Sequence, residues 1–416
     1  MAPCVAARTK TLRQHRMVTG NSGVVSGRRL GGATRHPGRS DTGRRKAAGE
    51  QGTSAPEDRR VVEAVWDADD VVRSYAVLGV VLLAGAVPGA CEAPYGYALY
   101  FGGLALSTLR IGAFRSAADP PRERITLRQG ALLPISASVA LLAVWWALRY
   151  GLDLHTALDA YFVLIGGVAV TNNIGEVLCA VQDWLPAVLT SPSLPVADWL
   201  LSAEDEGSIP VGTYRDDGLE VLTDGTVRVA PRVPLAASIG LAVALADCAS
   251  GHDSHTLNNL LATLLAADVL QLVGLNSFST AFATLAGLLA YDAFFVFGSE
   301  RALGENVMLS VATSDSFKGP FRLLFPSPTS PGGFSLLGLG DVAVPGLLLC
   351  LALRFDLCDQ QDGVVVPGTQ ELPYFKATTV GYATGLAVAF AVNAVTGAGQ
   401  PALVYLCPCT LGAVLA

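Results

Sequence analysis

Ten apolar blocks that carry almost no charge constrain this chain more than any other feature. They cover residues 74–90, 95–112, 131–148, 156–170, 234–248, 257–275, 277–298, 334–353, 377–395 and 401–416. A helix needs about 20 mainly apolar residues to cross a bilayer, and shorter or Gly- and Pro-interrupted spans are tolerated where neighbouring helices satisfy the backbone. Only 15% of the residues are charged, against roughly 25% in soluble domains. The sequence therefore predicts an all-α, multi-pass membrane protein and excludes a disordered or fibrous chain.

The connector between the second and third blocks indicates how the chain is oriented. Its basic residues outnumber Asp119 and Glu123, and they are Arg110, Arg115, Arg122, Arg124 and Arg128. By the positive-inside rule this connector is cytosolic. The longest connector, 183–233, is acidic and rich in Pro, Gly and Ser. Counting crossings places it in the cytosol too, and we interpret it as a solvated polar loop.

The N-terminal segment has a different composition from the rest of the chain. Residues 1–60 contain 13 of the 28 basic residues and 4 of the 35 acidic ones. Such a stretch cannot bury a core, so we expect residues 1–73 to be basic and disordered. Two interpretations stay open, namely an organelle transit peptide and a cytosolic tail held near anionic lipid. The block at 74–90 is then an extra span, a signal-anchor or part of a removed targeting segment.

The cysteines and histidines predict neither a disulfide framework nor a metal site. The eight cysteines lie mostly in or beside apolar blocks, where a thiol behaves as a small hydrophobe. Cys407-Pro408-Cys409 is too short for zinc-binding patterns, and His252 and His255 have no further ligands nearby in the sequence. We interpret both groups as structural or solvated.

Among the acidic residues inside apolar blocks, two are the most informative, and neither of their blocks contains Lys or Arg. They are Asp292, in the block at 277–298, and Asp341, in the block at 334–353. An ionised carboxylate near the centre of a bilayer costs roughly 2.5–3.5 kcal/mol on insertion scales. A feature of the fold must offset that cost.

Two carboxyl groups that face each other can share one proton, which leaves one neutral and one charged. The ionised group can then take a proton from water while the neutral one polarises a peptide carbonyl, so the pair is also a hydrolytic catalyst. A structural interpretation is a neutral Asp hydrogen-bonded to a neighbouring helix, which we expect for Asp268 in the block at 257–275. A third interpretation is ion or proton coupling in a transporter. On these grounds alone, protease and transporter are equally favoured.

Three motifs resemble the signatures of GxGD intramembrane aspartyl proteases, and among these the signal peptide peptidases. They are Tyr291-Asp292 followed by Phe294 and Val296-Phe297-Gly298, then Gly338-Leu339-Gly340-Asp341 with Pro345-Gly346, and last Gln400-Pro401-Ala402-Leu403. Further similar segments include Asn258-Asn259, Leu323-Leu324-Phe325-Pro326 and Arg354-Phe355-Asp356. One Gly-x-Gly-Asp would be a weak signal, but three signatures in this order are specific. The resemblance runs from about Tyr95 to the end.

The resemblance implies a presenilin-type core of nine helices at 95–416, with Asp292 and Asp341 as the catalytic pair on the sixth and seventh. Tyr291 would flank the first aspartate, and Gly338, Leu339 and Gly340 would line the substrate strand. The loop that opens the last helix would pack against the active site and contact substrate, and it comprises Gln400, Pro401, Ala402 and Leu403.

The resemblance also implies what the protein acts on and where. Its substrates would be membrane-embedded peptides such as remnant signal peptides and type II segments, cleaved without a metal or organic cofactor. The bilayer and a second copy of the chain are its other expected partners, and nucleic acid is not one. The endoplasmic reticulum membrane is the default location for the family, with a plastid or other endomembrane as the alternative.

The sequence departs from the family pattern in three places. Phe295 stands where Trp is usual, residues 300–305 form an insertion just after the first catalytic helix, and the last block is short. These departures are the only support for a second hypothesis, a catalytically inactive homologue that binds membrane segments.

Overall fold

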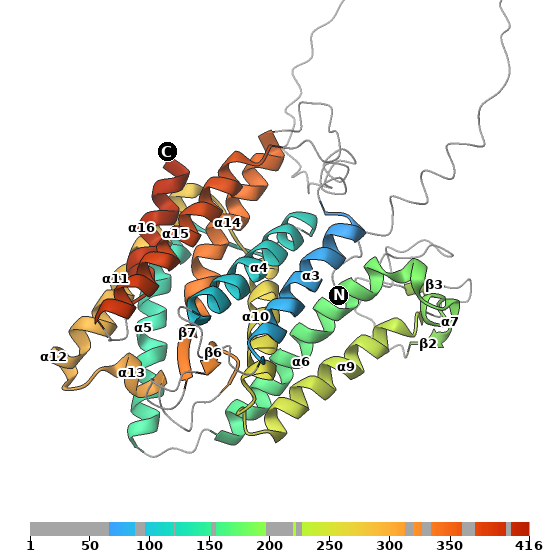
Figure 1. The fold of residues 1–416 in the computed structure, drawn as a ribbon, viewed down its shortest axis with the longest axis horizontal. Helices are drawn as coiled ribbons and strands as arrows, with labels where there is room; N and C mark the ends of the chain where they lie inside the picture. Colours follow the sequence, from blue (N-terminus) through green and yellow to red (C-terminus); the bar gives the residue numbers. More distant parts are fainter. Residues whose placement is uncertain are drawn as a thin grey trace, which may run out of the picture.

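A computed structural model of the chain describes residues 66–87, 96–119, 121–150, 155–196, 219–221, 227–312, 319–326, 334–359, 371–396 and 401–415. These residues are mainly helical (Figure 1). The long helices are α3 (Ala68–Ala84), α4 (Gly96–Ala118), α5 (Leu127–Arg149), α6 (His155–Ala180), α9 (Arg232–Ala249), α10 (His255–Leu272), α11 (Phe278–Ala293), α14 (Gly340–Asp359), α15 (Pro373–Thr396) and α16 (Leu403–Leu415). Shorter helical pieces are η3 (Gln182–Trp184), α7 (Ala187–Thr190), the π-helical turn η5 (Phe294–Gly298), α12 (Ser299–Leu303) and α13 (Val307–Ala312).

Seven short strands join the helices. They are β1 (Glu123–Ile125), β2 (Leu194–Pro195), β3 (Leu219–Val221), β4 (Val227–Val229), β5 (Val273–Leu275), β6 (Arg322–Pro326) and β7 (Phe334–Gly338). β1 pairs in parallel with β5, β2 and β3 flank β4 in antiparallel fashion, and β6 and β7 form an antiparallel pair. The helices therefore make up the body of the protein, and the strands lie at their ends.

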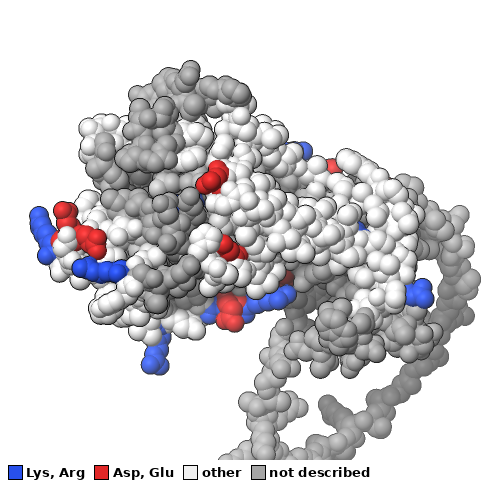
Figure 2. All heavy atoms as spheres, turned by 90° about the horizontal axis from the view of Figure 1, so that it is seen from below, with Lys and Arg blue, Asp and Glu red and all other residues white. Residues whose placement is uncertain are grey.

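The prediction of an all-α, multi-pass membrane protein is confirmed. Each apolar block coincides at least in part with one of the long helices. Five helical stretches in the described part of the chain are long and apolar enough to span a bilayer: Leu127–Arg149, His155–Ala180, Arg232–Ala249, Phe278–Leu303 and Pro373–Thr396. Figure 2 shows one face on which most of the described surface is uncharged and several of the few charged side chains gather at one edge.

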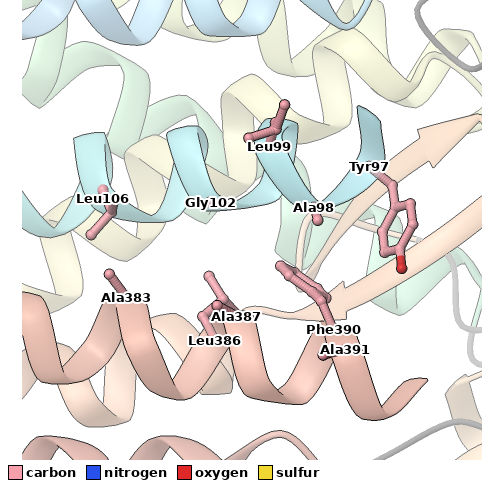
Figure 3. A pocket seen from close by; sticks show the side chains of 10 residues that line it. All are labelled: Tyr97, Ala98, Leu99, Gly102, Leu106, Ala383, Leu386, Ala387, Phe390 and Ala391. Atoms are coloured by element: carbon pink, nitrogen blue, oxygen red, sulfur yellow. The ribbon is translucent and has the colours of Figure 1, made fainter. Parts of the chain in front are cut away.

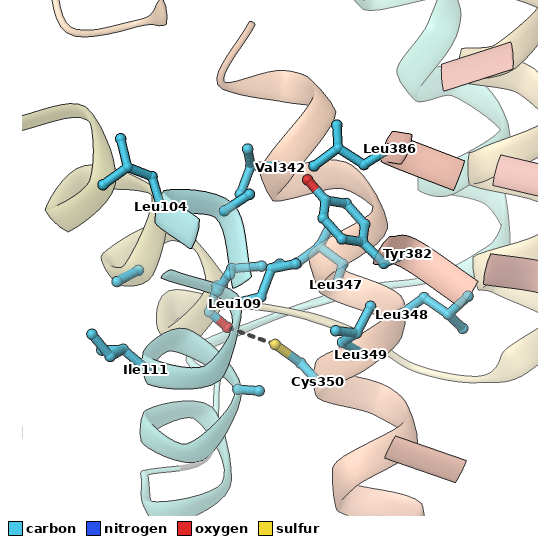
Figure 4. Packing of buried hydrophobic residues seen from close by; sticks show 14 of the residues in the cluster. Leu104, Leu109, Ile111, Val342, Leu347, Leu348, Leu349, Cys350, Tyr382 and Leu386 are labelled. Carbon is cyan, nitrogen blue, oxygen red and sulfur yellow. Dashed lines mark hydrogen bonds between the residues drawn. The ribbon is translucent and has the colours of Figure 1, made fainter. Parts of the chain in front are cut away.

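The packing of α4, α14 and α15 forms the centre of the buried core. Leu104 and Leu109 of α4 and Leu347 and Leu348 of α14 belong to one hydrophobic cluster, and all four are almost fully buried (Figure 4). Tyr382 of α15, also fully buried, belongs to the same cluster and lies on the side of α14 away from α4. The residue pattern of α14 has no polar face, which is typical of a helix that is enclosed by others.

Contacts at the two ends of the bundle agree with alternating helix directions. At one end, β1 follows α4 and pairs with β5, which follows α10. At the other end, the Nδ1 of His252, in the turn after α9, lies 2.6 Å from Asp247 Oδ2, and its Nε2 lies 3.4 Å from Asp159 Oδ1 of α6. The α5–α6 and α9–α10 connectors are therefore neighbours, as the count of crossings predicts.

A buried polar cluster joins α3, α4, α6 and α10. Arg115 of α4 is 1% exposed, and its guanidinium lies 2.6 Å from Glu176 Oε2 and 2.7 Å from Asp268 Oδ1. Asn173 Nδ2 also donates to Asp268 Oδ1, at 2.9 Å. Asp268 is hydrogen-bonded to a neighbouring helix, as predicted, through Asn172 and Asn173 of α6. The sequence analysis did not predict its basic partner Arg115, which reaches it from α4.

The structure corrects three expectations. The block at 334–353 begins as strand β7 and becomes helical only at Gly340. The first helix starts at Ala68, where the Asp67 side chain accepts the Asp70 N–H and caps the helix N-terminus, so it begins six residues before the predicted block. Cys179 is disulfide-bonded, whereas the sequence analysis predicted no disulfide framework. The predicted disordered segment at 1–73 lies outside the described residues, apart from residues 66–73.

Candidate active site

Asp292 lies near the C-terminal end of α11 and is 3% exposed. Its Oδ2 accepts a hydrogen bond from the backbone N–H of Leu403 at 3.3 Å. Leu403 is the first residue of α16, and the first amides of a helix have no partner inside the helix. The positive end of the α16 dipole is thus directed at the Asp292 carboxyl group.

Asp341 is the second residue of α14, and the strand β7 leads directly into it. β7 ends at Gly338, where an added Cβ would lie 3.2 Å from Asp341 Oδ2. At the next residue, the Leu339 N–H donates to the Phe321 carbonyl at 3.0 Å. Gly340 has open space on the side where a Cβ would stand. The Gly-Leu-Gly segment therefore keeps the surroundings of Asp341 free of side-chain bulk.

Three helices bring the two aspartates together. α11, which carries Asp292, packs against both α14 and α16, and the Asp341 carboxyl group lies within electrostatic range of Asp292. Pro401, Ala402 and Leu403 are buried beside them. Of the residues predicted for the site, only Gln400 lies outside the described residues.

Tyr291, the residue before Asp292, packs among apolar side chains of both hydrophobic clusters. Its ring lies 4.9 Å from that of Phe295, and it contacts a small hydrophobic cluster that includes Trp145 and Val307. This position links the first aspartate to the side of α11 that meets α5 and α13.

The sequence analysis missed two residues next to the pair. Tyr382 Oη donates to the backbone carbonyl of Asp341 at 3.3 Å. Cys407 is fully buried and lies within electrostatic range of both aspartates. The sequence held a usable signal for Cys407, because positions four apart share one face of a helix. Cys407 lies four residues after Leu403 and so shares the face of the predicted site residue.

The insertion at 300–305 forms ordered structure beyond Asp292. α11 continues as the π-helical turn η5, a form found often at functional sites. Ser299 Oγ donates to the Phe295 carbonyl at 2.6 Å, and Asn306 Nδ2 donates to the Val296 carbonyl at 3.0 Å. Glu305 accepts the Trp145 Nε1–H of α5 at 2.8 Å. Residues 300–305 thus tie the end of α11 to α5.

An apolar pocket of about 270 Å³ lies elsewhere, between α4 and α15 (Figure 3). Small side chains line much of it, including Ala98, Ala383 and Ala387, and the Tyr97 ring stands at one end. None of the predicted site residues contributes to this pocket.

Chemically, the site offers two carboxyl groups, one backbone amide and a strand end. This set can hold a water molecule between two acids and can present backbone hydrogen-bonding groups to an extended peptide.

Comparison with known proteins connects this geometry to a family. Residues 117–416 match the family model described as signal peptide peptidase. The human signal peptide peptidase is 29% identical over 77% of this chain and 80% of its own length, and the mouse protein is 28% identical over 76% and 75%. A Schizosaccharomyces pombe protein named "Probable intramembrane protease" is 29% identical over 75% of this chain and 86% of its own.

Proposed function

This chain belongs to the signal peptide peptidase family of intramembrane proteases, and from that premise we propose that it is an aspartyl endopeptidase whose catalytic pair is Asp292 and Asp341. The observation that carries the proposal is the convergence of α11, α14 and α16. It places the Leu403 amide 3.3 Å from Asp292 Oδ2 and brings Asp341 within electrostatic range of the same carboxyl group.

The surroundings of the two aspartates favour different roles for them. An N–H donor stabilises the charged form of a carboxyl group, so Asp292 is assigned as the base that takes a proton from the attacking water. Asp341 is then the neutral acid that donates a hydrogen bond to the scissile carbonyl. This division follows the rule that paired carboxyl groups in different environments perform acid and base chemistry separately.

The hairpin beside Asp341 supplies a binding mode for the substrate. In the described part of the chain, β7 pairs only with β6, which leaves its second edge for another strand. A substrate segment added there would run toward Asp341 and past Gly338, Leu339 and Gly340. Because the carbonyls of a helix are occupied by its own amides, the segment must unwind before it can be cleaved.

The proposed substrates are membrane-embedded peptides, such as signal peptides that remain after signal peptidase cleavage and other type II segments. The position of the pair fits such substrates, because both aspartates lie on helices of an apolar bundle, with Asp292 buried and Asp341 half-buried. We assign the protein to the endoplasmic reticulum membrane, with a plastid or other endomembrane as the alternative that imaging of a C-terminally tagged chain would reveal.

Cleavage of a labelled type II signal peptide by the full chain, purified in detergent, tests the proposal. We expect product from the parent protein, no product from Asp292→Asn or Asp341→Asn, and full activity from the matched control Asp69→Asn, an exposed position in the first turn of α3. Cleavage by either active-site variant would contradict the paired-carboxyl assignment. If the parent protein and the control cleave nothing, but an aspartyl protease inhibitor still binds the parent, the inactive homologue becomes the better hypothesis.

A further inference from the structure

A proline removes one hydrogen bond from the helix that carries Asp341. Pro345 lies inside α14, and in an α-helix the N–H of residue 345 would donate to the carbonyl of residue 341. Proline has no N–H. The carbonyl of Asp341 therefore lacks its ordinary helical donor, at the residue to which we assign the catalytic acid.

A side chain from another helix provides a donor at this place. Tyr382 Oη donates to the Asp341 carbonyl at 3.3 Å. The Tyr382 side chain is fully buried, so water cannot serve as an alternative partner for its hydroxyl group. Figure 4 shows the ring reaching from α15 to the first turns of α14, beside Val342.

We propose that Tyr382 is a positioning residue that replaces the hydrogen bond lost at Pro345 and thereby fixes the backbone of Asp341. The bond acts on the peptide plane between Asp341 and Val342, so it restricts ψ of Asp341 and the direction of its side chain. This inference rests on the proposed function, because it concerns the acid of the proposed pair.

The packing of α15 makes it a firm support for this bond. Gly385, about one turn after Tyr382, lies so close to α16 that an added Cβ would stand 2.9 Å from the carbonyl oxygen of Tyr405. α16 in turn donates the Leu403 amide to Asp292. α15 therefore contacts the Asp341 backbone directly and packs tightly against the helix that bonds Asp292.

A double-mutant cycle on the full chain in detergent tests the inference. Tyr382→Phe removes the hydroxyl group and keeps the ring, and Pro345→Ala returns the missing amide. We expect Tyr382→Phe to lower kcat about tenfold with little change in KM, which corresponds to about 1.4 kcal/mol at 25 °C. In the Pro345→Ala background the same substitution should cost less than about twofold, because the carbonyl then has a helical donor.

The controls separate positioning from folding. Tyr374→Phe makes the same chemical change at an exposed site on α15 and should leave kcat unchanged. Melting temperatures show whether each variant is folded. The cycle is also read on the affinity for a transition-state-mimicking aspartyl protease inhibitor, which remains measurable in slow variants.

Three results would overturn the inference. An equal loss of kcat from Tyr382→Phe in the parent and in the Pro345→Ala background would mean that the side chain contributes through general packing. No loss of kcat in the parent, which keeps Pro345, would mean that the hydrogen bond is unimportant. A parent protein that cleaves nothing would refute the proposed function and the inference together. If the parent cleaves and either of the first two results is found, the inference alone is refuted and the proposed function stands.

Discussion

Replacing Arg115 with Met tests the role of the buried polar cluster. The substitution removes a positive charge that is 1% exposed and keeps an apolar chain of comparable reach. It leaves two buried carboxylates without a cation, since the guanidinium lies 2.6 Å from Glu176 Oε2 and 2.7 Å from Asp268 Oδ1. Breaking a buried ion pair by removing one partner costs about 3–5 kcal/mol. At roughly 2–4 °C per kcal/mol, the melting temperature should fall on the order of 10 °C.

The assay is thermal unfolding of the full chain in detergent at one scan rate, with two matched variants. Arg110→Met makes the same change on the same helix, at a residue whose side chain is 45% exposed and lies 3.7 Å from an Asp70 oxygen. It should cost at most about 1 kcal/mol. Adding Glu176→Gln and Asp268→Asn to Arg115→Met removes every charge of the cluster and should recover more than half of the loss. The reasoning fails if Arg115→Met melts with the parent, or if the neutral triple variant is no more stable than the single one.

Three further predictions concern the site and the ends of the bundle. Gly338→Ala should lower kcat at least about tenfold with little change in melting temperature, because its Cβ would stand 3.2 Å from Asp341 Oδ2 and displace the carboxyl group; normal turnover would argue against close approach at this position. Gly385→Val should destabilise the protein by about 1–3 kcal/mol through overpacking between α15 and α16, as measured by thermal unfolding, and an unchanged melting temperature would contradict that packing. The hydrogen bond from His252 to Asp247 holds the pKa of His252 above its ordinary value of 6.5. Protonated His252 therefore stabilises the fold fully below about pH 6.5, and this stability is lost as the pH rises through the raised pKa. The difference in melting temperature between parent and His252→Gln should therefore be largest in acid, and a difference that grows with pH would refute this.

The sequence located the long helices, because each apolar block coincides at least in part with one of them. Only five described stretches, however, are long and apolar enough to span a bilayer. The three motifs singled out Asp292 and Asp341, whereas a carboxyl group without a basic neighbour in its own block is a property that Asp268 shares. The strand at β7 was missed because a short apolar run does not distinguish a buried strand from a helix.

Contacts between distant segments explain the other errors. The ion pair of Asp268 was missed because its partner Arg115 lies 153 residues away in the chain. Tyr382 escaped notice for the same reason, as its partner is a backbone carbonyl on another helix. The hydrophobic periodicity of a sequence describes one helix or strand at a time, so it cannot predict a contact between side chains or backbone groups of two distant helices.

The contacts of α3 limit how the amino end of the protein can mature. Trp66 Nε1 donates to Glu176 at 2.9 Å, Tyr75 Oη donates to Asn173 at 2.7 Å, and the Trp66 ring stacks on Phe114 at 5.3 Å. A processing peptidase that cut after these residues would remove both donors and uncover the charged cluster in the apolar bundle. Any leader that this chain sheds must therefore end before Trp66, and the mass of the protein isolated from cells would reveal the position of the cut.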